Sequence, residues 1–208
     1  VTGEYIEEKA RRFNFYDTYF PPYESRHFSF IPFSMWSFLA STFSSVGGVL
    51  SMQSLLIAAS NISPSIGTGI GLAATINWIL KDGLGQLGGV LFAAKFGQRF
   101  DLDPRFFRYY SMVSLQVGSF LEIITALLPS ALFLPMAAIA NVAKNISWMG
   151  MSATRTKIME EFQQNNNIAE ITAKHWSQVV TASVVGMAGG IGVSWIGSAL
   201  GISPTTFN

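Results

Sequence analysis

Charged and apolar positions are separated along this chain rather than interleaved. Residues 28–80 contain no Asp, Glu, Lys or Arg over 53 positions, and residues 176–208 contain none over 33. An uncharged apolar run of about 18 residues or more is typical of a helix that crosses a lipid bilayer. The pattern therefore predicts membrane-spanning helices rather than the amphipathic helices of a soluble domain.

Local turn signals divide the apolar runs into five segments. Proline and small polar residues at 61–64 and 129–130, together with the Asp101-Leu-Asp-Pro104 motif, are typical of chain reversals between helices. Asp103 suits the N-cap of the third helix, and Pro104 suits its first position. The expected spans are 34–60, 66–94, 104–128, 131–151 and 176–200. The sequence thus predicts an all-α, polytopic membrane protein with about five transmembrane helices.

Basic residues test this topology, because alternate loops of a polytopic protein lie on the same side of the bilayer. The N-terminal segment and the loops at 95–106 and 152–175 share one face, whereas the loops at 61–65 and 129–130 and the C-terminus share the other. Every Lys and Arg outside the spans is on the first face: Lys9, Arg11, Arg12, Arg26, Arg99, Arg105, Arg155, Lys157 and Lys174, with Lys95 and Arg108 at its border. This face is therefore expected in the cytoplasm, or in the stroma or matrix of an organelle. The alternative, a soluble helical bundle, would need long uncharged helices that are buried on all sides.

A separate N-terminal segment, residues 1–33, precedes the membrane domain that is expected over 34–208. It is rich in Tyr and Phe, whose rings favour the headgroup zone of a bilayer. The segment is expected to lie along the membrane surface or against a partner subunit, with an ordinary packed extension as the alternative. The chain begins at Val1 without a hydrophobic secretory signal. A removed organellar targeting peptide would explain this, and so would a fragment of a longer protein.

Composition and charge exclude several functions. Hydrophobic residues make up 50% of the chain, charged residues 12%, and the net charge is +1, which argues against a disordered chain and against a nucleic-acid partner. Without cysteine, the chain can hold no disulfide, thiolate metal site or iron–sulfur cluster. His27 and His175 lie on the basic face and could bind a metal or tetrapyrrole cofactor if they met, but an interfacial hydrogen-bonding role is commoner. No catalytic motif is present, so no enzyme activity, catalytic residue or metal site is predicted.

Charged residues inside the proposed spans are the natural candidates for function, since an unpaired charge in hydrocarbon costs roughly 3 kcal/mol or more. They are Lys81 and Asp82 in the second span, Glu122 in the third and Lys144 in the fourth. Counted along each helix at about 1.5 Å per residue, Asp82 and Lys144 lie at similar depths, and Glu122 lies closer to the far face. We therefore predict an Asp82–Lys144 ion pair, which would be either a structural contact or a gate or proton relay in a transport path.

Glycines concentrate in the second and fifth spans. Gly83, Gly85, Gly88 and Gly89 lie at helical spacing, which lets neighbouring transmembrane helices approach closely. Residues 83–88 also match the G-x-G-x-x-G pattern of dinucleotide-binding proteins. That pattern requires alternating strands and helices, which the sequence does not predict here. Helix packing is therefore the favoured interpretation of these glycines.

Several motifs resemble the root UV-B sensitive (RUS) family. They are Trp36-Ser-Phe-Leu-Ala40, the segment from Gly48 through Gln53 to Leu56, residues 74–93 with Trp78 and Lys81-Asp-Gly-Leu-Gly85, residues 127–135, Ala153-Thr-Arg155, and residues 166–174. The similarity covers roughly residues 20–193 and corresponds to the N-terminal, core half of the family. One departure is Gly89, which stands where an arginine is common. The resemblance implies an integral membrane protein of plastids or mitochondria, linked to the UV-B response and to vitamin B6 homeostasis.

Two functions are consistent with these features. In the first, the chain is a non-catalytic membrane subunit that docks in and stabilises a larger organellar assembly, in a plastid or thylakoid membrane rather than the mitochondrial inner membrane. Its expected partners are membrane lipids and other membrane protein subunits; no cofactor is evident, although lipid or pigment would be a suitable ligand. In the alternative, the chain is a RUS-type carrier or homeostasis factor linked to vitamin B6, with the charged residues of the spans along its path. A half-length chain lacks the second repeat that alternating access usually requires, which favours the subunit.

Overall fold

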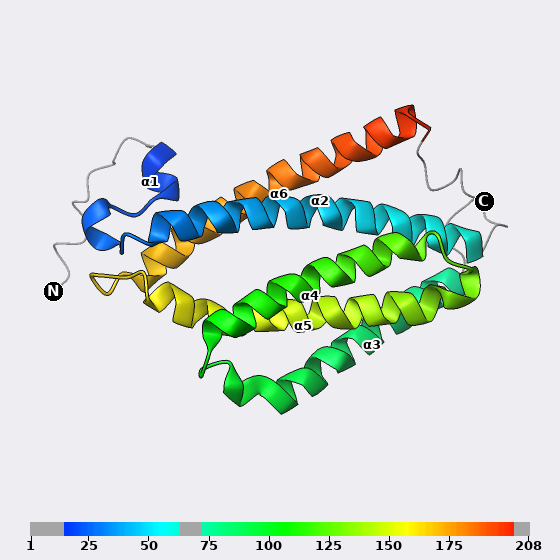
Figure 1. Ribbon diagram of the computed structural model, residues 1–208, viewed down its shortest axis with the longest axis horizontal. Coiled ribbons are helices and arrows are strands. Elements are labelled where there is room, and N and C mark those ends of the chain that lie inside the picture. The colour runs from blue at the N-terminus through cyan, green and yellow to red at the C-terminus, as the bar shows by residue number, and fades with distance from the viewer. Residues whose placement is uncertain (1–14, 63–71, 202–208) are drawn as a thin grey trace.

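Five long helices dominate the computed structural model, which describes residues 15–62 and 72–201 (Figure 1). They are α2 (Phe30–Ile62), α3 (Leu72–Phe96), α4 (Pro104–Thr125), α5 (Phe133–Glu160) and α6 (Ile168–Ala199). The short elements are α1 (Phe15–Tyr19) and the 3-10 turns η1 (Tyr23–Ser25), η2 (Gly97–Arg99) and η3 (Ser130–Leu132). Over the described residues the fold is all-helical, with one isolated β-bridge between Arg26 and Gln163. The all-α prediction is therefore confirmed for this part of the chain.

The helix boundaries differ from the expected spans mainly at the polar ends. α6 begins at Ile168, eight residues before the expected start, because its first turns are polar but still helical. Glu170 and Lys174 form an i,i+4 ion pair there with an N–O distance of 2.7 Å, which supports a helix outside an apolar layer. α5 similarly continues past the expected end at 151 to Glu160. The expected start of the second span, residue 66, lies outside the described residues.

The long helices run alternately up and down in an open row. α6 packs on α2, α2 on α4, α4 on α5, and α5 on α3, so that α6 and α3 form the two edges (Figure 1). The start of α2, the end of α3, the start of α4, the end of α5 and the start of α6 all lie at the left end of the view. We call this the basic end, because the described Lys and Arg residues outside the middle of the helices gather there: Arg26, Lys95, Arg99, Arg105, Arg108, Arg155, Lys157 and Lys174.

The start of α4 is fixed by the cap that the sequence indicates. The Asp103 side chain accepts a hydrogen bond from the backbone N–H of Phe106 at 3.0 Å, and Pro104 occupies the first turn. The cap satisfies one of the N–H groups that a helix start leaves without a partner, and proline needs no such partner. The predicted N-cap is confirmed.

Replacing Asp103 with alanine is expected to lower the free energy of unfolding by about 0.5–2 kcal/mol. The variant loses the hydrogen bond to the Phe106 N–H, which then depends on water. The measurement is the unfolding midpoint of the purified chain in detergent. Asp101→Ala is the matched control, because Asp101 precedes the helix and is exposed. Equal effects in the two variants would show that the cap does not contribute.

Glycine permits the closest helix contacts. A Cβ at Gly190 would lie 2.7 Å from Val49 Cβ, and one at Gly186 would lie 2.7 Å from Ser45 Cβ, so α6 approaches α2 along a Gly-xxx-Gly face. In α3, a Cβ at Gly88 would lie 2.7 Å from Val142 of α5. Gly85 and Gly89 also face α5, at Asn141 and Asn145, whereas a Cβ at Gly83 would meet no described atom within 4 Å.

Apolar side chains cover much of the outer surface of this row. α2, over Phe30–Ala59, and α6, over Ile168–Ala199, are long and apolar enough to cross a membrane by length and composition, and their most apolar windows are only 28% and 17% buried. Large exposed side chains also occur on the other helices, among them Ile79 and Leu91 of α3, Phe120 of α4 and Trp148 of α5. Among the described residues, α2 and α6 meet the criterion of length and composition, and the five expected spans remain a prediction.

The described part of the N-terminal segment packs against the basic end. The His27 N–H donates to the Phe162 carbonyl at 2.9 Å, and the Gln178 amide donates to the Tyr19 carbonyl at 2.7 Å. Lys174 donates to the Phe20 carbonyl at 3.2 Å. These contacts join residues 19–27 to the end of α5 and the start of α6. Residues 30–33, which we expected in the peripheral segment, form the first turn of α2, with Phe30 fully buried.

Candidate functional site

A buried polar cluster joins three helices in the middle of the row. It consists of Ser51 on α2, Glu122 on α4 and Lys144 on α5. Lys144 Nζ lies 2.6 Å from Glu122 Oε2 and 3.4 Å from Ser51 Oγ, and the Ser51 hydroxyl also donates to the same carboxylate oxygen. The Glu122 side chain is 3% exposed and that of Lys144 is 21% exposed. The negative charge is therefore neutralised inside the protein rather than by water.

The predicted Asp82–Lys144 ion pair is wrong. Lys144 pairs with Glu122, and Asp82 pairs instead with its neighbour Lys81 at 2.6 Å. The depth count followed Cα positions and neglected the direction of the side chains. Side chains of a helix lean toward its N-terminus, so on the antiparallel α4 and α5 the Glu122 and Lys144 side chains lean toward each other and bridge the difference in level.

A second polar cluster connects α3 to α5. Asp82 Oδ1 accepts from Lys81 Nζ at 2.6 Å and from Asn141 Nδ2 at 3.1 Å, and Asn141 Nδ2 also reaches the Lys81 carbonyl at 3.1 Å. The Lys81 side chain is 6% exposed and its ammonium group lies 4.8 Å from the centre of the Trp78 ring, a cation–π contact. The Asp82 side chain is 46% exposed. Asp82 is thus the charged group of the two clusters that remains most accessible from outside.

The two histidines have different surroundings at the basic end. His27 Nδ1 accepts from the Ser29 N–H at 3.3 Å, and its ring lies 4.2 Å from that of Phe28. His175 is 2% exposed and packs 5.2 Å from the Phe33 ring, and its Nδ1 has no hydrogen-bond partner among the described residues. The described residues contain no group of three or more His, Asp or Glu side chains that could hold a metal ion.

The other residues singled out by the sequence lie along the row. Gln53 of α2 accepts a hydrogen bond from the Ser194 hydroxyl of α6 at 2.6 Å, and Trp78 packs against a buried cluster that includes Leu55 and Phe133. Trp36 is 72% exposed near the start of α2. A Cβ at Gly48 would meet no described atom within 4 Å. The Gln53 contact therefore adds a polar link to the α2–α6 pair.

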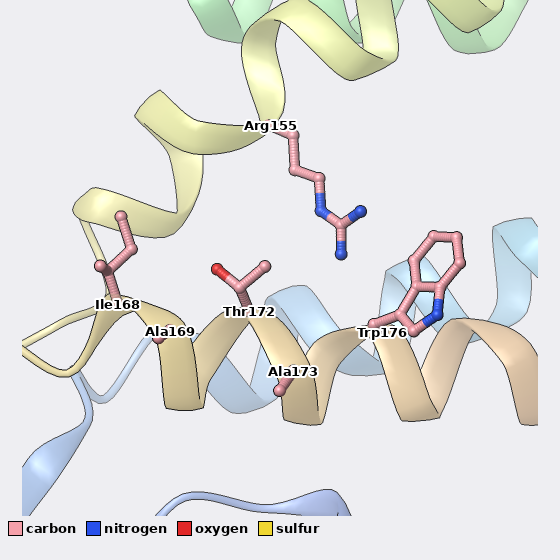
Figure 2. Close-up of a pocket in the computed structure, with 6 residues that line it drawn as sticks. All are labelled: Arg155, Ile168, Ala169, Thr172, Ala173 and Trp176. Atoms are coloured by element: carbon pink, nitrogen blue, oxygen red, sulfur yellow. The ribbon is translucent and has the colours of Figure 1, made fainter.

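An open pocket at the basic end was not anticipated. It lies between the end of α5 and the start of α6, has a volume of about 380 Å³, and is lined by Arg155, Ile168, Ala169, Thr172, Ala173 and Trp176 (Figure 2). The Arg155 guanidinium lies 4.8 Å from the centre of the Trp176 ring. The sequence contains one indication that these arginines differ from ordinary surface residues. Neither Arg155 nor Arg108 has an acidic residue three or four positions away in its helix with which to form an ion pair.

These features define a class of protein. It is an all-helical protein with long, outwardly apolar helices, paired charges at mid-height and arginines gathered at one end. The family model described as "Vitamin B6 photo-protection and homoeostasis domain" matches residues 12–205. The chain belongs to the root UVB sensitive (RUS) family.

Curated relatives support this assignment. The chain is 38% identical over 146 residues to "Protein root UVB sensitive 6" of Arabidopsis thaliana, a match that covers 70% of this chain and 28% of the relative. It is 28% identical over 161 residues to "RUS family member 1" of Dictyostelium discoideum, covering 74% and 29%. It is 36% identical over 143 residues to "Protein root UVB sensitive 2, chloroplastic" of Arabidopsis thaliana, covering 69% and 31%. The chain thus spans less than a third of each of these relatives, and no solved structure matches it.

Proposed function

We propose that this chain is a membrane-embedded, non-catalytic carrier unit of the RUS type that acts on vitamin B6 compounds. The observation that carries the proposal is the placement of paired charges at mid-height in a row of helices whose outer surface is apolar. Ionisable residues within membrane helices are costly, and they commonly mark substrate or ion pathways. The family description supplies the link to vitamin B6.

The distribution of apolar surface supports a membrane location for all five helices. α2 and α6 meet the criteria of length and composition for a span. α3, α4 and α5 carry the charged clusters, which lower their mean hydropathy, but their exposed side chains include Leu91, Phe120 and Trp148. A monomeric soluble protein rarely exposes such continuous apolar surface. We therefore infer five spans, with the basic end on the stromal or matrix side of an organellar membrane.

Asp82 is the residue through which we expect a vitamin B6 compound to bind. These compounds are substituted pyridines, and a carboxylate is a suitable partner for a protonated pyridine nitrogen. The Asp82 carboxylate is half-exposed, and its second contact, Asn141, holds it against α5. If Asp82 binds the substrate, the binding group lies near the middle of the membrane, as in many secondary transporters.

A plastid location agrees with the chloroplastic name of one relative.

A second candidate function, the accessory membrane subunit, is favoured by the open edges of the row. α3 and α6 each pack mainly on one neighbour, and both carry many exposed apolar side chains on their outer faces. A half-exposed Asp82 on an edge helix would be protected if another membrane protein covered α3. Lipids and further subunits are the partners that this function requires. Co-purification of a stoichiometric membrane protein whose binding is lost on altering the outer face of α3 would support it.

Uptake into vesicles tests the carrier function. Liposomes that contain the purified chain are expected to take up radiolabelled pyridoxine faster than empty liposomes, and Asp82→Asn is expected to reduce the rate roughly tenfold or more through loss of a charged hydrogen bond. Lys157→Gln is the matched control, since it removes an exposed charge at the basic end and should leave uptake unchanged. Equal rates in wild-type and empty liposomes would contradict the carrier function and leave the subunit as the better explanation.

A further inference from the structure

Two partly buried arginines at the basic end differ from the three cations there that are paired with an acid. Arg105, Lys157 and Lys174 each form an ion pair with a glutamate. Arg108 and Arg155 are half-buried and form no ion pair among the described residues. Arg108 donates to the Met151 carbonyl, one helical turn before Arg155, so the two positive charges lie near each other. Two adjacent, partly desolvated positive charges without a counter-charge are unfavourable unless an anion joins them.

Arg155 lines an open pocket, and Arg108 lies near the same part of α5. Arg155 extends from α5 toward α6, beside Thr172 and Trp176, at the pocket of about 380 Å³ (Figure 2). Its Nε is buried and has no hydrogen-bond partner among the described residues. The Trp176 ring lies 4.8 Å from the guanidinium, a cation–π contact. Arg108 lies on α4 and donates a hydrogen bond to the Met151 carbonyl of α5 at 3.0 Å.

His175 immediately precedes the pocket residue Trp176 on α6. It lies on the same helix as Thr172 and Trp176, is 2% exposed, and both arginines act on it electrostatically. Its Nδ1 also has no partner within the described residues. Arg155 Nε, from the pocket lining, and His175 Nδ1, beside it on α6, are therefore two buried nitrogen atoms without a hydrogen-bond partner among the described residues.

We propose that the pocket between α5 and α6 binds the phosphate group of a phosphate monoester, with Arg155 as its main ligand and Arg108 as the second positive charge. A carboxylate would neutralise one of the two arginines, whereas a phosphate monoester carries up to two negative charges and offers three acceptor oxygens. The Nε and one Nη of Arg155 suit two parallel bonds to such a group. The pocket is larger than a phosphate, so it also has room for an organic part against Trp176.

The phosphate can come from a soluble ester or from a lipid headgroup, since the basic end is where the proposed membrane domain would meet the headgroups. Both sources offer the same chemistry to Arg155. The site is separate from the mid-height clusters at Asp82 and Glu122, and it does not depend on the carrier function. Binding of phosphate at Arg155 and uptake through Asp82 are therefore tested by different variants and different measurements.

Calorimetric titration of the purified chain tests the proposal. In phosphate-free buffer at low salt, phenyl phosphate is the soluble probe, and nanodiscs with or without phosphatidic acid supply the lipid probe. At least one probe is expected to bind the wild type saturably, with Arg155→Gln weakening that binding roughly tenfold or more. Arg155→Lys keeps the charge but not the two parallel bonds, and an intermediate loss is expected. Binding of one probe alone identifies the source of the phosphate.

Arg105→Gln is the matched control. It removes one positive charge from the same end of the row, but Arg105 is exposed and already paired with Glu161 at 2.6 Å. Its effect on binding is expected to be less than about twofold. Thermal unfolding without ligand shows whether each variant is folded. Equal losses in Arg105→Gln and Arg155→Gln, unchanged affinity in the folded Arg155 variants, or no binding of either probe to the wild type would overturn the proposal.

Discussion

Replacing Lys144 with methionine is expected to lower the free energy of unfolding by about 3–5 kcal/mol. Methionine keeps an apolar side chain of similar length but removes the charge that lies 2.6 Å from the Glu122 carboxylate. Glu122 is then a buried anion with the Ser51 hydroxyl as its remaining described partner. The measurement is a reversible unfolding titration in mixed micelles, which reports the fraction folded as denaturing detergent is added.

Two further variants separate the ion pair from its surroundings. Glu122→Leu combined with Lys144→Met removes both charges and is expected to recover most of the lost stability, because the cost comes from leaving one charge alone. Lys157→Met breaks an exposed pair with Glu160, at 3.5 Å, and should change stability by at most about 1 kcal/mol. If Lys144→Met were no worse than Lys157→Met, the buried pair would not hold α4 and α5 together.

The sequence predicted the helices well because their signals are local. Each uncharged run is interrupted by proline or by small polar residues, and the helices end near those interruptions. Asp103 and Pro104 identify a helix start from two adjacent positions. The alternation of helix direction then follows from short connections, and it gathers the basic residues at one end as expected. The signal in each case lies within a few residues of the feature that it predicts.

The lateral order of the helices was not available from the same signals. Beyond the polar first turns of α6, neither α2 nor α6 has one distinctly apolar face, so their sequences do not indicate which face meets a neighbour. The pairing of Lys144 depends on the rotation of α5 and on the direction of its side chains, and a count of residues from the helix end contains neither. The same limit applies to Arg108 and Arg155, which are far apart in the sequence. They come near each other only when α4 packs on α5, where Arg108 donates to the Met151 carbonyl one turn before Arg155.

α5 connects the polar parts of the molecule. Asn141 faces Asp82 on α3, and Lys144, one helical turn later, faces Glu122 on α4. Arg155, near the end of the same helix, reaches α6. A rotation or axial shift of α5 would therefore alter the Asp82 and Glu122 clusters and the pocket at the basic end together.

The second large effect is expected at the contact between α2 and α6. Replacing Gly186 with alanine should destabilise the protein by about 1–3 kcal/mol, although alanine is the better helix former by about 1 kcal/mol. The new Cβ would meet the Thr42 backbone carbonyl and would lie 2.7 Å from Ser45 Cβ. A side chain can change rotamer to avoid a clash, but a backbone carbonyl cannot. α6 would therefore have to move away from α2. The unfolding titration used for Lys144→Met measures the change.

Gly192→Ala is the control for this substitution, because it adds the same methyl group to the same helix. A Cβ at Gly192 would meet no described atom within 4 Å, so only helix propensity should act, and stability is expected to stay equal or to rise by up to about 1 kcal/mol. Opposite signs for the two variants would show that close backbone approach, rather than helix formation, requires glycine at 186. Equal effects would contradict this prediction, because they would mean that α6 does not pack closely against α2 at Gly186.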